Sequence, residues 1–149
     1  MHIGKICTED AVCCDRTETV QGAALLMRKH HVGDVIVVDR VDGEARPAGI
    51  VTDRDIAVSV IALGLDPASL LVGDVMSDDL LVAEDQDDIY ETIEHMRLRG
   101  IRRVPVVNAR GALTGVVSAD DLLEFLAEEM GELSRISGYQ QTQEKRMRQ

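Results

Sequence analysis

The stretch Gly49-Ile50-Val51-Thr52-Asp53-Arg54-Asp55-Ile56 decides the fold, because it returns later as Gly115-Val116-Val117-Ser118-Ala119-Asp120-Asp121-Leu122. Each copy contains a glycine, two β-branched residues, a hydroxyl residue and, three places later, an aspartate. This order predicts a short buried strand that runs into a helix. The hydroxyl residue then stands at the N-cap and the aspartate at the third helical position. The unpaired N–H groups of such a helix start can receive an anion or a ribose edge.

Two interpretations of this motif stay open. Thr52 with Asp55, and Ser118 with Asp121, are close to a capping box in which Asp replaces the usual Glu or Gln. A single copy is better explained as a helix cap than as a ligand site. The duplication favours a shared binding role.

The motif belongs to a tandem repeat that covers most of the chain. When Ile3 is placed over Val72, one register holds until Val37-Val38 meet Val106-Val107. The register then shifts, because the first copy has a longer turn at residues 42–47. Such internal periodicity is the sign of a duplicated structural unit.

Both copies predict the order β-α-β-β-α, and hence an α+β fold. Apolar residues with helical spacing follow a short strand, as in Val20, Ala23 and Met27. Two strands joined by a tight turn come next, and a closing helix follows. The expected strands are 12–14, 35–38 and 48–51 in the first copy and 81–83, 104–107 and 113–117 in the second. The expected closing helices are 53–63 and 119–133.

The predicted boundaries are 3–63 for the first repeat, 64–71 for a linker, 72–133 for the second repeat and 134–149 for a polar tail. Ser137-Gly138 is expected to break the last helix, so that the tail is frayed or disordered, with a docking segment as the alternative. Pro105 predicts an edge strand or a strand start.

Composition excludes several classes of protein. The net charge of −11 and the 2% of aromatic residues argue against nucleic-acid binding, which needs a basic face and stacking platforms. No apolar run approaches the roughly 18 residues of a membrane span. The N-terminus also lacks the apolar core of a signal peptide. We therefore expect a cytoplasmic protein that binds neither membrane nor nucleic acid.

The three cysteines, Cys7, Cys13 and Cys14, fit no metal-binding spacing. In the repeat alignment they match Met76, Val82 and Ala83, so we interpret them as small core hydrophobes. Cys13 and Cys14 should point to opposite faces of a sheet. We predict no metal site.

These motifs resemble the cystathionine β-synthase (CBS) domain pair, of the stand-alone bacterial type, over about residues 3–131. Supporting motifs are residues 72–77, Val-Gly-Asp-Val-Met-Ser, and residues 102–107, Arg-Arg-Val-Pro-Val-Val. The resemblance implies two repeats related by a pseudo-two-fold axis, with clefts between them that bind AMP, ADP, ATP or S-adenosylmethionine. It also implies a homodimer of two pairs.

The resemblance carries functional roles onto particular residues. The hydroxyl residue and the aspartate of the motif would hold phosphate and ribose. Family positions matching Arg102 and Arg103 often contact phosphate. The expected ligand-binding residues are Thr52, Arg54, Asp55, Arg102, Arg103, Ser118 and Asp121.

The two copies differ in charge at aligned positions. The second copy has Arg102-Arg103 where the first has Gly33-Asp34, and the first has Arg54 where the second has Asp120. We therefore expect the stronger site to combine Asp121 with Arg102 and Arg103, although an arginine of one repeat could reach the other cleft.

Three functions are considered. The favoured one is a regulatory, non-enzymatic module that senses an adenosine compound, needs no cofactor and signals to an unknown partner. The alternative is a metal- or stress-responsive protein that uses His2, Cys7 and the acidic surface. A nucleotide hydrolase is the weakest, because no Ser-His-Asp set, P-loop or paired metal ligands can be recognised.

Overall fold

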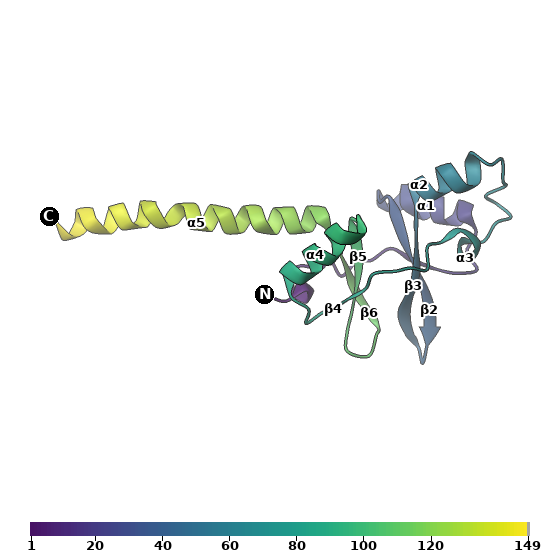
Figure 1. Cartoon of the computed structure of the whole chain (residues 1–149), viewed down its shortest axis with the longest axis horizontal. Helices are drawn as coiled ribbons and strands as arrows, with labels where there is room; N and C mark the ends of the chain where they lie inside the picture. The colour runs from purple at the N-terminus through teal and green to yellow at the C-terminus, as the bar shows by residue number, and fades with distance from the viewer. Residues whose placement is uncertain (149) are drawn as a thin grey trace.

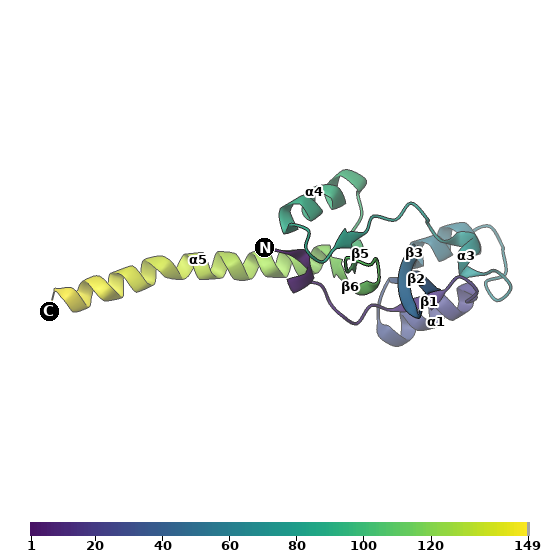
Figure 2. The same ribbon diagram turned by 90° about the horizontal axis from the view of Figure 1, so that it is seen from below.

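In the computed structural model, residues 1–148 are described, and they form two three-stranded sheets with helices packed against them, together with one long helix that leaves the body (Figures 1 and 2). The predicted α+β fold of two repeats is confirmed. The strand orders are β1-β2-β3 in the first sheet and β4-β5-β6 in the second. Within each sheet the first two strands are parallel and the last two are antiparallel.

The elements of each repeat follow the predicted order. The first half contains η1 (Ile3–Lys5), β1 (Cys13–Asp15), α1 (Val20–His30), β2 (Asp34–Val41), β3 (Glu44–Thr52), α2 (Asp53–Ile56) and the π-helical turn η2 (Ala57–Ile61). The second half contains α3 (Val72–Val75), β4 (Ala83–Glu84), α4 (Ile89–Arg99), β5 (Arg103–Val107), β6 (Leu113–Ser118) and α5 (Ala119–Met147).

Local sequence explains the helix ends. The Thr19 hydroxyl accepts a hydrogen bond from the Gly22 N–H at 3.0 Å at the start of α1. His31 then adopts a left-handed conformation, with φ of 54°, and ends that helix. Gly100 ends α4 in the same way, with φ of 63°. A left-handed residue after the last turn is a common helix terminator.

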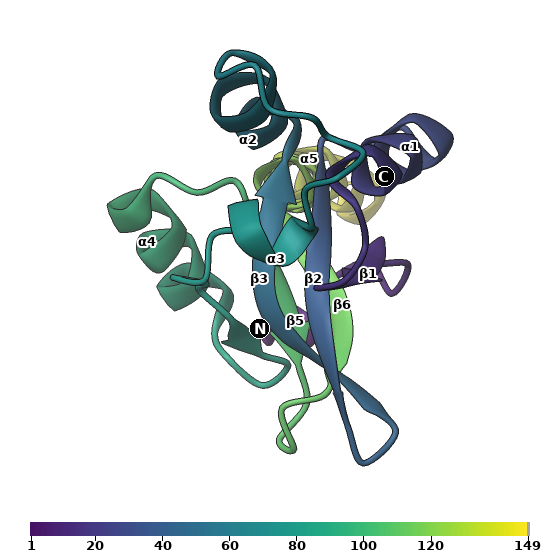
Figure 3. The same cartoon turned by 90° about the vertical axis from the view of Figure 1, so that its right-hand side faces the viewer.

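The central strands β2 and β5 are buried on both faces. In β2, Val35 and Val37 face α1, while Ile36 and Val38 pack against Val116 of the other sheet. The two sheets therefore face each other, with one shared core between them (Figure 3). Because both faces of these strands are buried, their sequences are continuous apolar runs.

The two repeats exchange their first segments. Ile3, from the start of the chain, is fully buried in the core of the second repeat, beside Val104 and Val117. Val72, from the start of the second repeat, is fully buried in the core of the first, beside Val35. The packing units therefore differ from the sequence repeats, and neither core is complete without the other half.

The motif glycines allow this exchange. A Cβ on Gly49 would lie 2.7 Å from the Ser77 carbonyl oxygen, and one on Gly115 would lie 2.6 Å from that of Thr8. Only glycine lets the exchanged segment cross the strand at this distance.

The last helix corrects one prediction. α5 runs without a break from Ala119 to Met147, so the expected end near Leu133 and the break at Ser137-Gly138 are wrong. A helix-interior glycine costs only about 1 kcal/mol, so Gly138 by itself does not have to end the helix. The Thr142 hydroxyl also donates to the Gly138 carbonyl at 3.0 Å.

Pro105 gives a second correction, because it lies inside β5, which is the central strand of its sheet. Opposite it, the backbone N–H and C=O of Val116 bond to Thr8, not to β5. The nitrogen of Pro105 thus points toward β4, whose pairing begins one residue later at Val106. At the aligned position the Ile36 N–H donates to the Val12 carbonyl, a bond that proline cannot make.

Candidate ligand-binding cleft

A cleft of about 580 Å³ opens between the two repeats. It lies where the closing motif of the first repeat faces the segment that leads into β5 of the second. Its lining comes from four segments, namely residues 33–34 before and in β2, residues 50 and 52–55, residues 77 and 79–81, and residues 100–103. Of the predicted site residues, it brings together Thr52, Arg54, Asp55, Arg102 and Arg103.

Thr52 and Asp55 form a complete capping box at the start of α2. The Thr52 hydroxyl accepts from the Asp55 N–H at 3.0 Å, and the Thr52 N–H donates to Asp55 Oδ2 at 2.9 Å. Asp55 therefore uses one carboxylate oxygen as a cap, and no hydrogen bond to Oδ1 is found within residues 1–148. The capping and ligand-binding interpretations are compatible, because a carboxylate has two oxygens.

Three arginines line the cleft, together with the four aspartates Asp34, Asp53, Asp55 and Asp79. Arg102 Nη2 lies 3.0 Å from Asp120 Oδ1, but both side chains are 73% exposed, so this ion pair contributes little. Arg103 Nε lies 3.2 Å from Asp34 Oδ1. Among the residues with described placement, Arg54 has no ion-pair partner within 4.0 Å. An anionic ligand could recruit Arg102 and Arg54 at low cost.

Asp34 opposes an anion in this cleft. Its side chain is only 10% exposed, and burial raises the pKa of the carboxyl above its usual range. The Arg103 guanidinium lowers this pKa and the Asp53 carboxylate raises it further. Burial dominates because removing a charged group from water costs more than a partly exposed partner returns.

Aliphatic side chains line the other side of the cleft. Ile50, Leu80, Leu81 and Ile101 supply this wall, and Leu81 and Ile101 pack on the second core. A mostly apolar slot with a few charged groups at one end suits a flat base attached to a polar sugar and phosphate.

Ser118 and Asp121 lie outside this cleft. They form a matching capping box at the start of α5, in which Asp121 Oδ2 accepts from the Ser118 N–H at 2.8 Å and from its hydroxyl at 2.7 Å. The space between the repeats on that side is about 30 Å³ and has neither residue in its lining. The expected grouping of Asp121 with Arg102 and Arg103 in one cleft is therefore wrong. The arginines reach across to the motif of the first repeat.

Sequence reasoning missed two parts of the cleft. Residues 77–81 and Ile101 were not predicted as ligand contacts, although the repeat alignment covers both. Asp34, which aligns with Arg103, lies in the same cleft as Arg103. The signal for this segment was the alignment of Ser77 with Thr8. In the structure Ser77 crosses Gly49 and Thr8 crosses Gly115.

The cysteines lie apart from this cleft. All three are partly buried: Cys7 packs on the second core, Cys14 on the first, and Cys13 on the core between the sheets. Cys13 and Cys14 thus face opposite sides of β1, as predicted. Burial raises the pKa of each thiol, that of Cys14 to about 11, so thiolate is scarce at neutral pH.

Residues 1–148 contain no cluster of three or more His, Cys, Asp or Glu side chains arranged to hold a metal ion. No helix in the same range combines the length and apolarity that crossing a bilayer requires.

Comparison with known proteins assigns both repeats to one family. The family model for the CBS domain matches twice, at residues 3–61 and 72–128. Among curated relatives, uncharacterized protein MK0525 of Methanopyrus kandleri is 33% identical over 124 residues. That match covers 83% of this chain but only 62% of the relative. Hypoxic response protein 1 of Mycobacterium tuberculosis is 33% identical over 116 residues, 78% of each chain.

Solved structures support the same grouping. Hypoxic Response Protein I, crystallised with two coordinated zinc ions, has a TM-score of 0.74 and 29% identity, over 83% of this chain and 98% of its own. A CBS domain protein of Pyrobaculum aerophilum, PAE2072, complexed with AMP, has a TM-score of 0.74 and 29% identity, over 82% and 90%.

Proposed function

This chain belongs to the CBS domain family, and from that premise we propose that it is a regulatory module that binds an adenosine compound in the cleft between its repeats. AMP, ADP, ATP and S-adenosylmethionine are the candidate ligands. The proposal gives the chain no catalytic step and no required cofactor. Its regulated partner is unknown.

The observation that carries the proposal is the meeting of Asp55 with Arg102 and Arg103 in one cleft. The Oδ1 atom of Asp55 can accept hydrogen bonds from the vicinal hydroxyls of a ribose. The arginines can neutralise a phosphate, and the aliphatic wall can hold adenine. The AMP complex of the similar Pyrobaculum protein supports the adenosine class.

The proposed signal is a shift between two arrangements of the repeats. A ligand changes such an equilibrium only by binding one arrangement more tightly. Phosphate recruitment of Arg103 would weaken its ion pair with Asp34, which joins the two repeats. We also propose a cytoplasmic homodimer; exposed Leu25, Val58 and Ile61 offer apolar surface for it.

Matched aspartate variants test the site by calorimetry. Asp55→Asn keeps an oxygen for the helix cap but removes the charge, and we expect affinity for AMP or ATP to fall about tenfold to a hundredfold. Asp121→Asn is the control, because it changes the same cap position outside the cleft. Circular dichroism should show both variants folded.

Other outcomes would reject the assignment. If Asp121→Asn weakens binding and Asp55→Asn does not, the main site lies at the second motif. If a thermal-shift panel of the four ligands stabilises nothing, the adenosine proposal fails, since ligand at 100 times its Kd adds about 2.7 kcal/mol. Zinc in the same panel tests the metal-responsive alternative, and product formation from ATP tests the hydrolase.

A further inference from the structure

The ligand-binding cleft contains more acids than bases. Three arginines and four aspartates line it, and two of these residues have an ion-pair partner outside the lining. Asp79 Oδ1 lies 2.7 Å from Arg99 Nη2, and Arg102 Nη2 lies 3.0 Å from Asp120 Oδ1. With these two partners included, five acids stand against four bases, in a chain whose net charge is −11. The cleft is therefore suited to a ligand of small negative charge.

Asp53 and Asp34 form an acid pair at the arginine end of the cleft. The Asp53 N–H donates to the Gly33 carbonyl at 2.9 Å, and a Cβ on Gly33 would lie 3.2 Å from Asp53 Oδ2. The Asp53 carboxylate thus lies over Gly33, and it is close enough to Asp34 to raise the pKa of that carboxyl. Asp34 in turn contacts Arg103. Two carboxylates therefore stand beside the cations that a phosphate would use.

The second repeat shows that the backbone does not require an acid at the position of Asp53. Gly33 and Asp53 align with Arg102 and Ala119, and the Ala119 N–H donates to the Arg102 carbonyl at 2.8 Å in the same way. The helix cap is supplied by other residues of the motif. The one hydrogen bond that the Asp53 carboxylate accepts within residues 1–148 comes from the Arg54 N–H, at 2.8 Å, and an asparagine oxygen can accept it equally. The charge of Asp53 is therefore free for another role.

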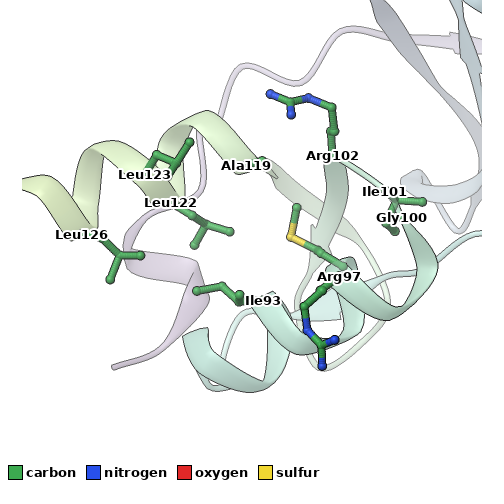
Figure 4. A pocket seen from close by; sticks show the side chains of 10 residues that line it. Ile93, Arg97, Gly100, Ile101, Arg102, Ala119, Leu122, Leu123 and Leu126 are labelled. Atoms are coloured by element: carbon green, nitrogen blue, oxygen red, sulfur yellow. The ribbon is translucent and has the colours of Figure 1, made fainter.

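The arginines provide positive charge for one phosphate group. In Figure 4 the Arg102 guanidinium points away from Ile93 and Leu122, which line an apolar groove of about 340 Å³ between α4 and α5. Arg102 and Arg54 are the two cations that a ligand can recruit easily, because Arg103 is held by the buried Asp34. A phosphate chain longer than one group finds no further arginine or lysine in the described lining of the cleft, and it faces the acid pair instead.

We propose that Asp53, together with Asp34, makes the cleft selective for an adenosine ligand with a single phosphate over the di- and triphosphates. The inference rests on the proposed function, because it concerns the same cleft. Each further phosphate adds negative charge close to the acid pair, where repulsion is stronger than in bulk water. The field of a strongly acidic chain acts in the same direction. Selectivity of this kind comes from repulsion of the wrong ligand, not from extra contacts with the right one.

Calorimetry with AMP, ADP and ATP tests the selectivity on the full chain. The buffer contains no magnesium, because that cation would neutralise part of the phosphate chain. We expect affinity to fall from AMP to ADP to ATP, with ATP about tenfold or more weaker than AMP. Added salt should reduce this difference, because it screens the repulsion.

A neutral variant tests the residue. Asp53→Asn removes the charge but keeps the size of the side chain and an oxygen for the Arg54 N–H. We expect the difference in affinity between AMP and ATP to shrink about threefold to tenfold in this variant. Glu128→Gln is the matched control, because it removes one negative charge from an exposed position on α5 outside the cleft, and it should leave the difference unchanged. Circular dichroism should show both variants folded.

The failure of this inference differs from the failure of the proposed function. If ATP binds as tightly as AMP without magnesium, the selectivity is refuted while adenosine binding stands. If ATP binds more weakly but the difference persists in Asp53→Asn, the shape of the cleft sets the limit and the role of Asp53 is wrong. If AMP, ADP and ATP all fail to bind, nucleotide binding in this cleft is rejected, and the selectivity with it.

Discussion

Asp34 and Arg103 occupy aligned positions in the two repeats and meet at 3.2 Å between them. The duplication therefore placed opposite charges on either side of the pseudo-two-fold axis. Both residues line the large cleft, and both also line the small space on the other side. A substitution of either residue should alter both ligand binding and the contact between the repeats.

Asp34→Asn should strengthen phosphate binding about tenfold. The change removes a buried negative charge and frees Arg103, and near a surface one such charge is worth a few kcal/mol at most. Titration of AMP against native and variant chains measures the effect. Equal affinity for adenosine, which has no phosphate, is the control. A weaker AMP complex in the variant would contradict this role.

Asp34→Asn should also abolish the part of the pH dependence of AMP affinity that comes from the titration of Asp34. The pKa of Asp34 is raised in the folded state, so folding takes up a proton as pH falls through that value, and stability from this group rises. Protonation likewise removes the repulsion of phosphate. Native AMP affinity should therefore approach that of the Asn variant as pH falls, and a constant ratio between them would count against the assignment.

At the scale of elements, each motif glycine lies under a crossing segment. The residue that opens the binding motif is fixed by backbone packing and not by the ligand. Gly115 meets the Thr8 carbonyl, and Gly49 meets that of Ser77. In each repeat, this close contact holds the strand that carries the glycine, the crossing segment and the helix cap that follows the strand in one packed unit.

Gly115→Ala should destabilise the fold by about 1–3 kcal/mol, because its Cβ would lie 2.6 Å from a backbone oxygen that cannot move freely. The matched change Gly131→Ala has no atom within 4 Å and should stabilise α5 by about 0.5–1 kcal/mol. Urea unfolding followed by circular dichroism measures both. Similar effects from the two changes would refute the crossing argument.

At the scale of the whole molecule, the exchange of first segments joins the repeats. Each core needs a residue from the other half of the chain, as Ile3 and Val72 show. The residues that line the large cleft come from both halves as well. The two repeats are therefore expected to unfold as one cooperative unit. A substitution in an exchanged segment should destabilise the core of the other repeat.

Ile3→Ala should cost about 2–5 kcal/mol, the usual range for emptying a fully buried aliphatic site. Hydrogen exchange should then speed up most in β5 and β6, not in the strands of the first repeat. Val72→Ala is the reciprocal control and should loosen β2 and β3. Loosening confined to the mutated residue's own sequence repeat would contradict the exchange.

The sequence by itself determined the duplication, the β-α-β-β-α order, the buried strands and both helix caps. These features depend on local chemistry: β-branched runs, a hydroxyl residue before a helix, and glycine at turns. The cleft residues Thr52, Arg54, Asp55, Arg102 and Arg103 could also be named. Thr52 and Asp55 recur in the second copy as Ser118 and Asp121, whereas the arginines were named from the family resemblance and from the charge difference between the copies.

Only the tertiary structure decided which residues share a cleft. From the sequence, Arg102 and Arg103 were assigned to one site with Asp121 because all three residues belong to the second repeat. The pseudo-two-fold packing instead carries the arginines to Thr52 and Asp55. The course of α5 past Gly138 was likewise not predicted, because a glycine inside a helix costs only about 1 kcal/mol and does not by itself fix where the helix ends.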